Sequence, residues 1–474
     1  MAEIETEKSR HSFWTYVSFG SYNILWTIPT AAMNVFMYYY YHTVVGLDPI
    51  FIFIVVAINT VWAGLNDPLI GWLTDKNFKW TRKWGRRFPW VLVGFIPQSL
   101  SLVMIFSAPH ADPANPIPAM LWFLVSLLLF DLFITLVDLH VSMLRADKFR
   151  MEKERRKYAG AWGFFDMVAQ VLGMMLPPLL IFFGKDNPLS YTVMALIIAG
   201  IAIIFGLTSL PGLREDKIVI DRYYSKEYGR LNILKGLKSV LKTKSFMSLY
   251  AAYVSFLTAT TIMTNMVPYL VTFILRSEDP DVMVIFFAMF LLGALISIPI
   301  WLKILKKVNN NKKTYLIGSF LLCVLIVPLA FFQTDLDLMI IMFFAGMGNG
   351  SVWTIGMPVL YSNVQDDYIV RTGGNQKGIL VGTWAVIGLI TAFIDEALIT
   401  LVFTLTGFRG GIETYLDLLN SGVSSHVVIA GIRILLGFVP ALVLLTGTLI
   451  FWKYYPLTQD KVLENKAKLL ELGL

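Results

Sequence analysis

The chain alternates long apolar runs with short polar segments. Residues 11–47 contain no Asp, Glu, Lys or Arg, and the same is true of residues 245–275. A helix needs about 20 apolar residues to cross a bilayer, and a helix satisfies its own backbone amides in lipid. These runs therefore predict membrane-spanning helices. Charges, clusters of Pro, Asn and Gly, and aromatic flanks delimit twelve of them, at residues 17–43, 50–74, 88–108, 117–144, 159–184, 189–210, 245–275, 281–303, 314–334, 337–364, 378–406 and 427–454.

A long polar insert, residues 211–244, divides the twelve expected helices into two groups of six. It holds no apolar run long enough to cross a bilayer. Two six-helix bundles joined by such a linker resemble the layout of the major facilitator superfamily. We therefore expect an all-α membrane protein with this fold. The expected divisions are an N-terminal bundle over 1–210, a linker over 211–244, a C-terminal bundle over 245–454 and a tail over 455–474.

The composition excludes several classes of protein. Of the 474 residues, 56% are apolar and 15% are charged, and the mean hydropathy is +0.66. An average soluble domain carries about 25% charged residues, so a soluble enzyme, a fibre and a disordered chain are excluded. The single cysteine, Cys323, excludes a disulfide within the chain.

The distribution of basic residues predicts the orientation in the membrane. The net charge is +7, and 35 of the 39 Lys and Arg residues fall in alternate loops that include both ends of the chain and the linker. Basic residues accumulate on the cytoplasmic side, so we expect a multi-pass protein of the cell membrane with both termini, the linker and the tail in the cytoplasm. The basic loops are expected to contact anionic lipid rather than nucleic acid.

Two neighbouring motifs carry the most specific signal. Residues 66–75 are NDPLIGWLTD, and residues 84–94 are WGRRFPWVLVG. This pair resembles the glycoside–pentoside–hexuronide:cation symporter family, which includes the melibiose carrier. The resemblance implies a secondary carrier that couples a sugar to a cation. Further matches are YYYHTVVGL at residues 39–47, Glu154-Arg155, and Asp367-Tyr368 with Thr372 and Gly373.

The same motifs predict a charged gate. Gly71 and Asp75 are four residues apart and share a helical face, and a glycine lets a neighbouring helix approach closely. Because Asp75 stands beside a basic loop that contains Arg86 and Arg87, we expect ion pairs that close the cytoplasmic end in one state and break in another. The alternative is a solvated loop that only sets the orientation.

Asp67 is the strongest candidate ligand for a coupling ion. An ionisable residue near the bilayer centre costs about 2.5–3.5 kcal/mol and marks a functional site by default. Asn66 and Asp67 precede Pro68, which frees a backbone carbonyl, so the segment offers oxygens to an alkali cation or a carboxylate to a proton. By resemblance, Asn66 and Asp67 match cation-coordinating positions. Ala63 stands where the family has a second carboxylate on this helix. Proton-coupled transport and uncoupled transport therefore stay open, as does a purely structural role for Asp67.

The fourth expected helix carries further polar residues. Asp131, Thr135 and Asp138 are four and three residues apart and therefore lie on one helical face. By resemblance, Thr135 matches the family's cation threonine and Asp138 its substrate carboxylate. We expect Thr135 to complete the Asp67 site and Asp138 to bind a polar solute, whereas Asp131 has no counterpart in the family. The alternative is that this face only packs against other helices.

Other sugar-binding positions of the family are altered. Thr27 stands where the family has a carboxylate on helix one, Ser142 replaces its tryptophan and Gly163 its arginine. A galactoside site held by two carboxylates and an arginine is therefore not intact. Thr27 stays a candidate substrate ligand by position, together with Trp384, which can stack on a sugar ring. Because some animal relatives of the family resemble lysolipid carriers, an amphipathic solute is a second option.

The last three expected helices contain unusual residues. Asp395 and Glu396 are expected to form a structural ion pair with Arg433, because an ion pair lowers the cost of inserting each charge. The alternative is a role in an outer gate. Residues 346–350 are GMGNG. Without a preceding strand, this pattern favours close helix packing over nucleotide binding.

We expect a secondary active transporter that moves a small polar solute, by preference a sugar or glycoside, together with a monovalent cation. The alternative is a lipid or lysolipid carrier on the same fold, coupled or uncoupled. An enzyme is not expected, because HExxH and GxSxG motifs are absent. No catalytic residue, cofactor or resident metal is expected besides the coupling ion, H⁺ or Na⁺. We also expect a monomer surrounded by lipid.

Overall fold

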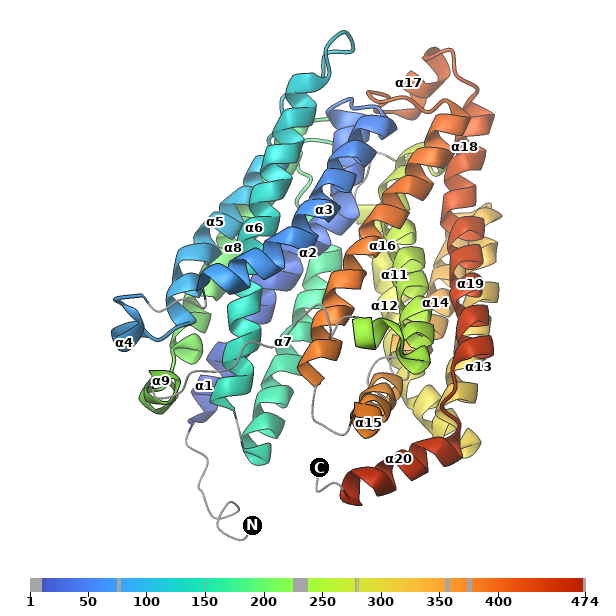
Figure 1. Ribbon diagram of the computed structural model, residues 1–474. Helices are drawn as coiled ribbons and strands as arrows, with labels where there is room; N and C mark the ends of the chain where they lie inside the picture. Colours follow the sequence, from blue (N-terminus) through green and yellow to red (C-terminus); the bar gives the residue numbers. More distant parts are fainter. Residues whose placement is uncertain are drawn as a thin grey trace. The chain divides into compact units, whose positions relative to one another are not determined.

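The structure is a computed structural model that describes residues 11–74, 78–149, 151–224, 238–277, 279, 281–353, 359–372 and 377–471. Regular structure in these residues is helical (Figure 1), apart from one isolated β-bridge between Asp112 and Asn115. The predicted all-α class is therefore confirmed.

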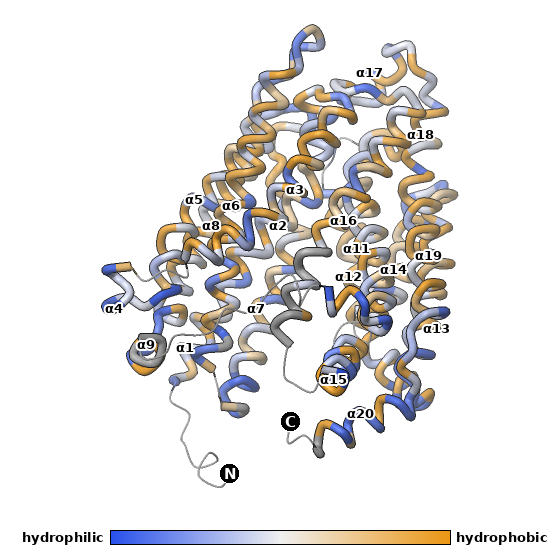
Figure 2. The backbone as a smooth tube through the Cα atoms, in the orientation of Figure 1, coloured by the Kyte–Doolittle hydropathy of each residue, from blue (hydrophilic) through white to orange (hydrophobic). Residues whose placement is uncertain are grey.

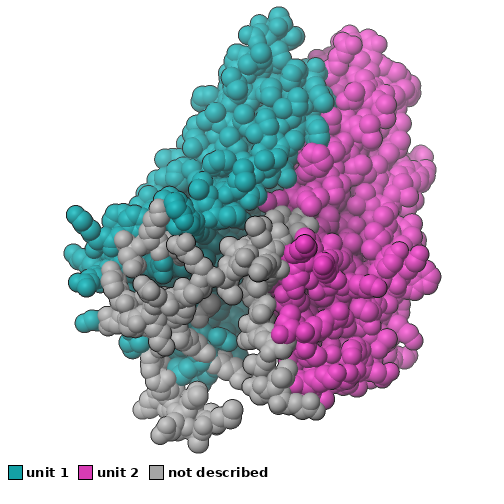
Figure 3. Space-filling model, viewed as in Figure 1, with its two compact units in different colours: residues 1–229, 410–413 teal, residues 230–409, 414–474 magenta. Residues whose placement is uncertain are grey.

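The chain divides into two compact units (Figure 3). Unit 1 comprises Met1–Gly229 and Gly410–Glu413, and unit 2 comprises Arg230–Arg409 and Thr414–Leu474. The division falls within the predicted linker. The helices of unit 1 are α1 (Phe13–Gly20), α2 (Tyr22–Tyr39), η1 (Tyr40–Val44), α3 (Pro49–Thr74), α4 (Thr81–Trp84), α5 (Phe88–Ile105), α6 (Ile117–Lys148), α7 (Glu152–Leu179), α8 (Pro188–Leu213) and α9 (Lys217–Tyr224). Those of unit 2 are α11 (Lys244–Tyr269), η2 (Leu270–Ile274), α12 (Asp281–Val308), α13 (Asn311–Ile326), η3 (Val327–Ala330), α14 (Asp335–Ser351), α15 (Tyr361–Thr372), α16 (Lys377–Thr406), α17 (Tyr415–Asn420), α18 (Ser425–Arg433), η5 (Ile434–Phe438), α19 (Val439–Tyr454) and α20 (Gln459–Glu471).

Ten helices in the described part of the chain are long and apolar enough to cross a membrane. Figure 2 shows apolar residues along α5, α8 and α19, whereas α20 is largely hydrophilic. The other two predicted spans correspond to α2, which carries several polar residues, and to α14, which ends at Ser351 shortly before undescribed residues. Each of the twelve predicted ranges overlaps a long helix.

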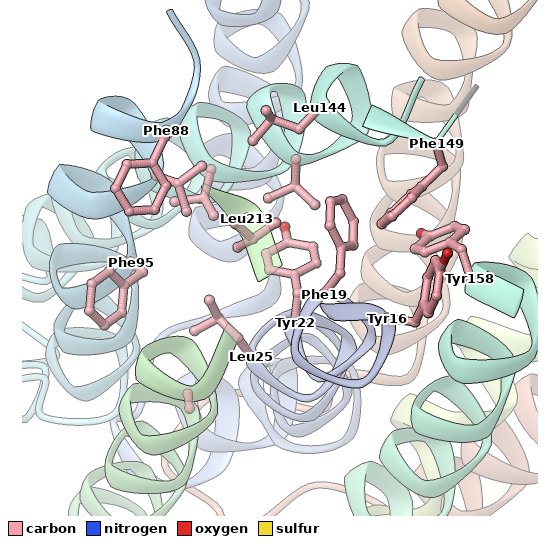
Figure 4. Close-up of a cluster of buried hydrophobic side chains, with 14 residues drawn as sticks. Tyr16, Phe19, Tyr22, Leu25, Phe88, Phe95, Leu144, Phe149, Tyr158 and Leu213 are labelled. Carbon is pink, nitrogen blue, oxygen red and sulfur yellow. The ribbon is translucent and has the colours of Figure 1, made fainter. Parts of the chain in front are cut away.

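A buried hydrophobic cluster holds the helices of unit 1 together (Figure 4). Its members come from α1, α2, α5, α6, α7 and α8 and from Phe149 after α6. Phe149 stacks on Tyr158 with ring centroids 5.0 Å apart, and it also contacts Tyr16 and Phe19. Burying a large apolar side chain contributes roughly 1.5–3 kcal/mol. The cluster therefore fixes α6 and α7 against α1 and α2. Among these helices, α6 carries the predicted site residues Thr135 and Asp138.

The first long helix of each unit ends in the same way. α2 passes into the π-helical turn η1, and α11 passes into η2. The second residue after each turn has a positive φ, 87° at Gly46 and 57° at Arg276. In both units the next residue donates its N–H to the carbonyl six residues earlier. The two units thus repeat the same backbone conformation at this point, although the residues that adopt it differ.

The predicted close packing at residues 346–350 is confirmed. A Cβ on Gly346 would collide with the backbone of Phe290, and a Cβ on Gly293 would collide with that of Phe343. Both pairs join α14 to α12, so these helices approach backbone to backbone in unit 2. Small residues permit this approach in membrane helices.

An ionic cluster outside the spanning helices joins the start of α1 to the segment after α8. His11 Nδ1 lies 2.9 Å from Glu154 Oε1, and His11 Nε2 lies 2.8 Å from Asp216 Oδ2. Lys148 Nζ lies 3.7 Å from the other oxygen of Asp216. Because only the imidazolium has two N–H donors, it alone satisfies both carboxylates. The hydrogen bond to Asp216 raises the pKa of His11, and Glu154 adds to this shift.

We expect the protein to lose stability as the pH rises through the pKa of His11. The contribution of the imidazolium is complete below the unfolded value of 6.5 and is lost above the higher folded value. The loss is on the order of 1 kcal/mol, since one hydrogen bond to a carboxylate disappears and Asp216 is partly exposed. Thermal unfolding measured against pH for wild type and His11→Gln tests this, with the exposed His110→Gln as control. An unchanged pH dependence in His11→Gln contradicts it.

Candidate functional site

The predicted polar site of unit 1 lies where α3 packs against α6. Pro68 removes a backbone donor inside α3, one residue after Asp67. Asn66 is fully buried, and Asp67 is half-buried. The site is therefore built on a proline-weakened helix that packs against an uninterrupted one.

Asn66 is fixed by α6. Its Nδ2 donates to Asp131 Oδ2 at 3.2 Å and to the Asp131 backbone oxygen at 3.3 Å. Asn66 Oδ1 is buried and has no hydrogen-bond partner among the described residues. An unsatisfied buried acceptor costs about 1–3 kcal/mol, so this amide oxygen is available to a cation or to a donor.

Two carboxylates meet beside this amide. The Thr135 hydroxyl lies within hydrogen-bonding reach of the Asp67 carboxylate. Asp131, one turn earlier on the same face of α6, lies close enough to Asp67 for a direct electrostatic interaction. Ala63 leaves this part of α3 with one carboxylate, and Asp131 places a second one beside it from α6. Two carboxylates, a hydroxyl and an amide oxygen thus gather from two helices.

Asp138, two turns after Asp131 on α6, belongs to a second polar group. Tyr22 of α2, which is 1% exposed, donates its hydroxyl to Asp138 Oδ1 at 3.0 Å. Arg145, another two turns along, acts electrostatically on Asp138, and its guanidinium carbon lies 5.9 Å from the centre of the Trp162 ring. Residues seven apart share a helical face. α6 therefore carries an anion and a cation on one face, with aromatic rings beside them.

Thr27, another predicted substrate ligand, does not join this group. Thr27 is 3% exposed and lies against α7, where its carbonyl oxygen packs close to Gly173. Its hydroxyl has no hydrogen-bond partner within the described ranges. Ser142 is exposed, and a Cβ on Gly163 would meet open space. The side chain of Trp384 lies outside the described residues.

The close helix approach predicted at Gly71 is not found, and the gating role of this segment stays a prediction. A Cβ on Gly71 would lie 4.0 Å from Leu139, an ordinary contact, so no close helix approach requires glycine there. Asp75 lies outside the described residues, and its predicted ion pairs stay a prediction.

The Arg86-Arg87 segment binds Glu215 through its backbone. The N–H of Arg87 donates to Glu215 Oε1, and the N–H of Phe88 does so at 3.2 Å. Glu215 therefore caps the first turn of α5. Gly85 has a φ of 90°, and a Cβ there would collide with the Glu215 carboxyl. Burial raises the pKa of Glu215, and these backbone donors oppose the shift.

The predicted ion pair of Arg433 with the acids of α16 is wrong. Arg433 donates to the Ala330 carbonyl oxygen at 3.1 Å and to that of Phe332 at 2.9 Å. Its guanidinium carbon also lies 4.7 Å from the centre of the Phe332 ring. Carbonyls at the end of the short helix η3 lack helical partners, and they satisfy the guanidinium in place of a carboxylate.

Two residues of the Asp138 group were not among the predicted site residues. As one of many basic residues near a loop, Arg145 is easily overlooked, although its spacing from Asp138 places both on one helical face. Tyr22 carries no comparable signal, because its contact with Asp138 joins two helices far apart in sequence.

Long apolar helices around buried polar groups are typical of a multi-pass membrane protein, and solved structures share the fold. A bacterial homologue of the human lysosomal transporter Spinster has a TM-score of 0.59 and 12% identity, covering 97% of this chain and 99% of that chain. The nucleoside transporter NupG has a TM-score of 0.55 and 13% identity, covering 93% and 98%.

The sequence model described as MFS/sugar transport protein matches residues 18–459, and the chain belongs to this family. It is 20% identical to sodium-dependent lysophosphatidylcholine symporter 1-A of Danio rerio, over 98% of this chain and 90% of that protein. It is 22% identical to sodium-dependent lysophosphatidylcholine symporter 1 of Gallus gallus, over 93% of this chain and 86% of that protein. The expected major facilitator fold and a membrane transporter are confirmed. A specific likeness to the melibiose carrier is not.

Proposed function

We propose that the protein is a sodium-coupled carrier of a lysophospholipid with a zwitterionic headgroup. The observation that carries this proposal is the Asp138–Arg145 pair, which puts an anion and a cation on one face of α6 beside Trp162. Relatives that span nearly the whole chain are named for sodium and lysophosphatidylcholine. The altered sugar positions Ser142 and Gly163 agree with a solute other than a galactoside.

The Asp67 group supports sodium as the coupling ion. Asp67, Asp131, the Thr135 hydroxyl and Asn66 Oδ1 are oxygen ligands, which hard cations prefer. Ala63 stands where the family has a second carboxylate, but Asp131 supplies a second carboxylate from α6. The site therefore keeps two negative charges. Two ionised carboxylates in lipid are costly unless a cation lies between them. A bound sodium ion offsets part of that cost.

The Asp138 group supports a zwitterionic headgroup. An arginine guanidinium binds phosphate with paired hydrogen bonds, and Arg145 is exposed. A quaternary ammonium is attracted to a carboxylate and to the face of an aromatic ring. Asp138 and Trp162 offer these two partners within unit 1. A neutral sugar has no use for two opposite charges placed in this way.

Uptake by proteoliposomes tests the proposal. Lysophosphatidylcholine with a labelled acyl chain is offered outside, and albumin then extracts the label that has stayed in the outer leaflet. An inward sodium gradient is expected to increase the protected label, whereas an equal potassium gradient is not. Labelled disaccharide is the matched polar solute. Sodium-driven uptake of the disaccharide without uptake of the lysolipid would overturn the proposal in favour of a sugar carrier.

A further inference from the structure

Two consecutive acids lie buried within α16 of unit 2. Asp395 is 2% exposed and Glu396 is 3% exposed. Neither forms an ion pair within the described residues, and Arg433 of α18 is engaged by two backbone carbonyls. The other titratable or charged groups on helices packed against α16 are Lys244, Tyr250, Tyr253 and Tyr269 on α11, His426 on α18, and Tyr361, Asp366, Asp367, Tyr368 and Arg371 on α15.

Two hydroxyl groups next to Asp395 make no hydrogen bond of normal geometry within the described residues. Thr258 of α11 is fully buried, close enough to act on the Asp395 carboxyl, and its Oγ1 makes no hydrogen bond of normal geometry. Elsewhere on α11, Thr260 and Thr264 donate to carbonyls of their own helix. Thr391, one turn before Asp395 and 7% exposed, is likewise unsatisfied among the described residues.

One oxygen of each carboxyl group also lacks a donor. Asp395 Oδ1 and Glu396 Oε2 are buried and accept no hydrogen bond in the described part of the chain. An ionised carboxylate in such surroundings is heavily penalised, and the usual response is to take up a proton. A carboxylic acid, by contrast, has a hydrogen to donate to a hydroxyl oxygen such as that of Thr258.

We propose that Asp395, with Thr258 and Thr391 beside it, is a proton-binding site of unit 2. It is built separately from the cation site at Asp67. The proton comes from water and joins one carboxyl oxygen of Asp395, and it returns to water when the site becomes hydrated. The binding of this proton does not depend on the proposed solute. Only its coupling to transport rests on the proposed function.

A proton fits the site better than a sodium ion does. Consecutive residues of a helix point about 100° apart, so Asp395 and Glu396 do not converge on one point. Thr391 and Asp395 share a face, which leaves one carboxyl and hydroxyl groups at the site. Groups of three or more His, Cys, Asp or Glu that could hold a metal are absent from the described residues.

Infrared difference spectroscopy of the full-length protein in lipid tests proton binding directly. The carboxylic-acid C=O band is followed as the pH is raised in sodium-free buffer. We expect one component of this band to titrate in wild type, in Glu396→Gln and in the exposed control Asp460→Asn, and to be missing in Asp395→Asn, while other buried acids account for the remaining intensity. A titration of Asp395→Asn that matches wild type, or loss of the same component in Glu396→Gln, would overturn the assignment. Loss of the wild-type band on adding sodium alone would identify a sodium site instead.

Uptake driven by an imposed proton gradient tests the coupling. In wild type, an inward proton gradient is expected to increase lysolipid uptake at least two-fold. In Asp395→Asn this increase disappears while the response to sodium is retained. If wild type transports no lysolipid, the proposed function fails, but the infrared titration still decides whether Asp395 binds a proton. Uptake by Asp395→Asn that still responds to the proton gradient contradicts the coupling.

Discussion

Replacing Asp67 with asparagine is expected to abolish sodium-driven accumulation of the solute. The variant keeps the size of the side chain and its hydrogen bonding to Thr135 but removes the charge that attracts the ion. One charge crossing a potential of 100 mV supplies about 2.3 kcal/mol, enough for about a fifty-fold gradient. We expect that gradient to fall to about one in Asp67→Asn, measured as steady-state uptake by proteoliposomes.

The controls separate coupling from folding. Exchange of labelled for unlabelled solute needs no ion gradient, so Asp67→Asn is expected to retain it. Asp166→Asn is the matched control, because Asp166 is a half-buried acid on α7 of the same unit and lies outside the Asp67 group. Accumulation by Asp67→Asn at the wild-type level would remove Asp67 from the coupling mechanism.

The second large effect is expected at Arg145. Arg145→Gln removes the cation proposed to bind the phosphate, and a hydrogen bond to a charged group contributes about 1.5–3 kcal/mol. Each 1.36 kcal/mol is a factor of ten, so the affinity for lysophosphatidylcholine is expected to fall about ten- to one hundred-fold. The affinity for a monoacylglycerol, which lacks phosphate, is expected to change little. Competition for uptake by the two lipids measures both.

Lys153→Gln is the control for Arg145. Lys153 is an exposed cation close to Arg145 in sequence, at the start of α7, and its loss changes the net charge equally. It is expected to leave both affinities unchanged. Equal losses for the two lipids in Arg145→Gln, or equal effects of the two variants on lysophosphatidylcholine, would show that Arg145 acts on general surface charge and not on the headgroup.

Much of the fold follows from the pattern of apolar runs. All twelve predicted ranges overlap long helices, because burial in lipid demands both length and hydrophobicity. The packing of GMGNG at residues 346–350 was also predictable, since small residues have one main use in such helices. The local grouping of Asn66, Asp67 and Thr135 agrees with the motif resemblance, and their role in ion binding stays a prediction.

Features that depend on contacts between distant segments were not predictable. Glu215 lies more than one hundred residues from the turn that binds it, and nothing near Arg87 indicates this partner. Arg433 binds carbonyl oxygens, which every residue has, so no sequence pattern distinguishes them from a carboxylate partner. The repeat between η1 and η2 resides in backbone geometry, with a glycine in one unit and Arg276 in the other.

The central claim is that an ion bound at Asp67 favours binding of the solute. Equilibrium binding of lysophosphatidylcholine to the protein in nanodiscs, with and without sodium, measures this most directly. The account predicts that sodium tightens lysolipid binding, that the lysolipid tightens sodium binding by the same factor, and that both effects disappear in Asp67→Asn. Lysolipid affinity that is the same with and without sodium, or a sodium effect that persists in Asp67→Asn, would contradict it.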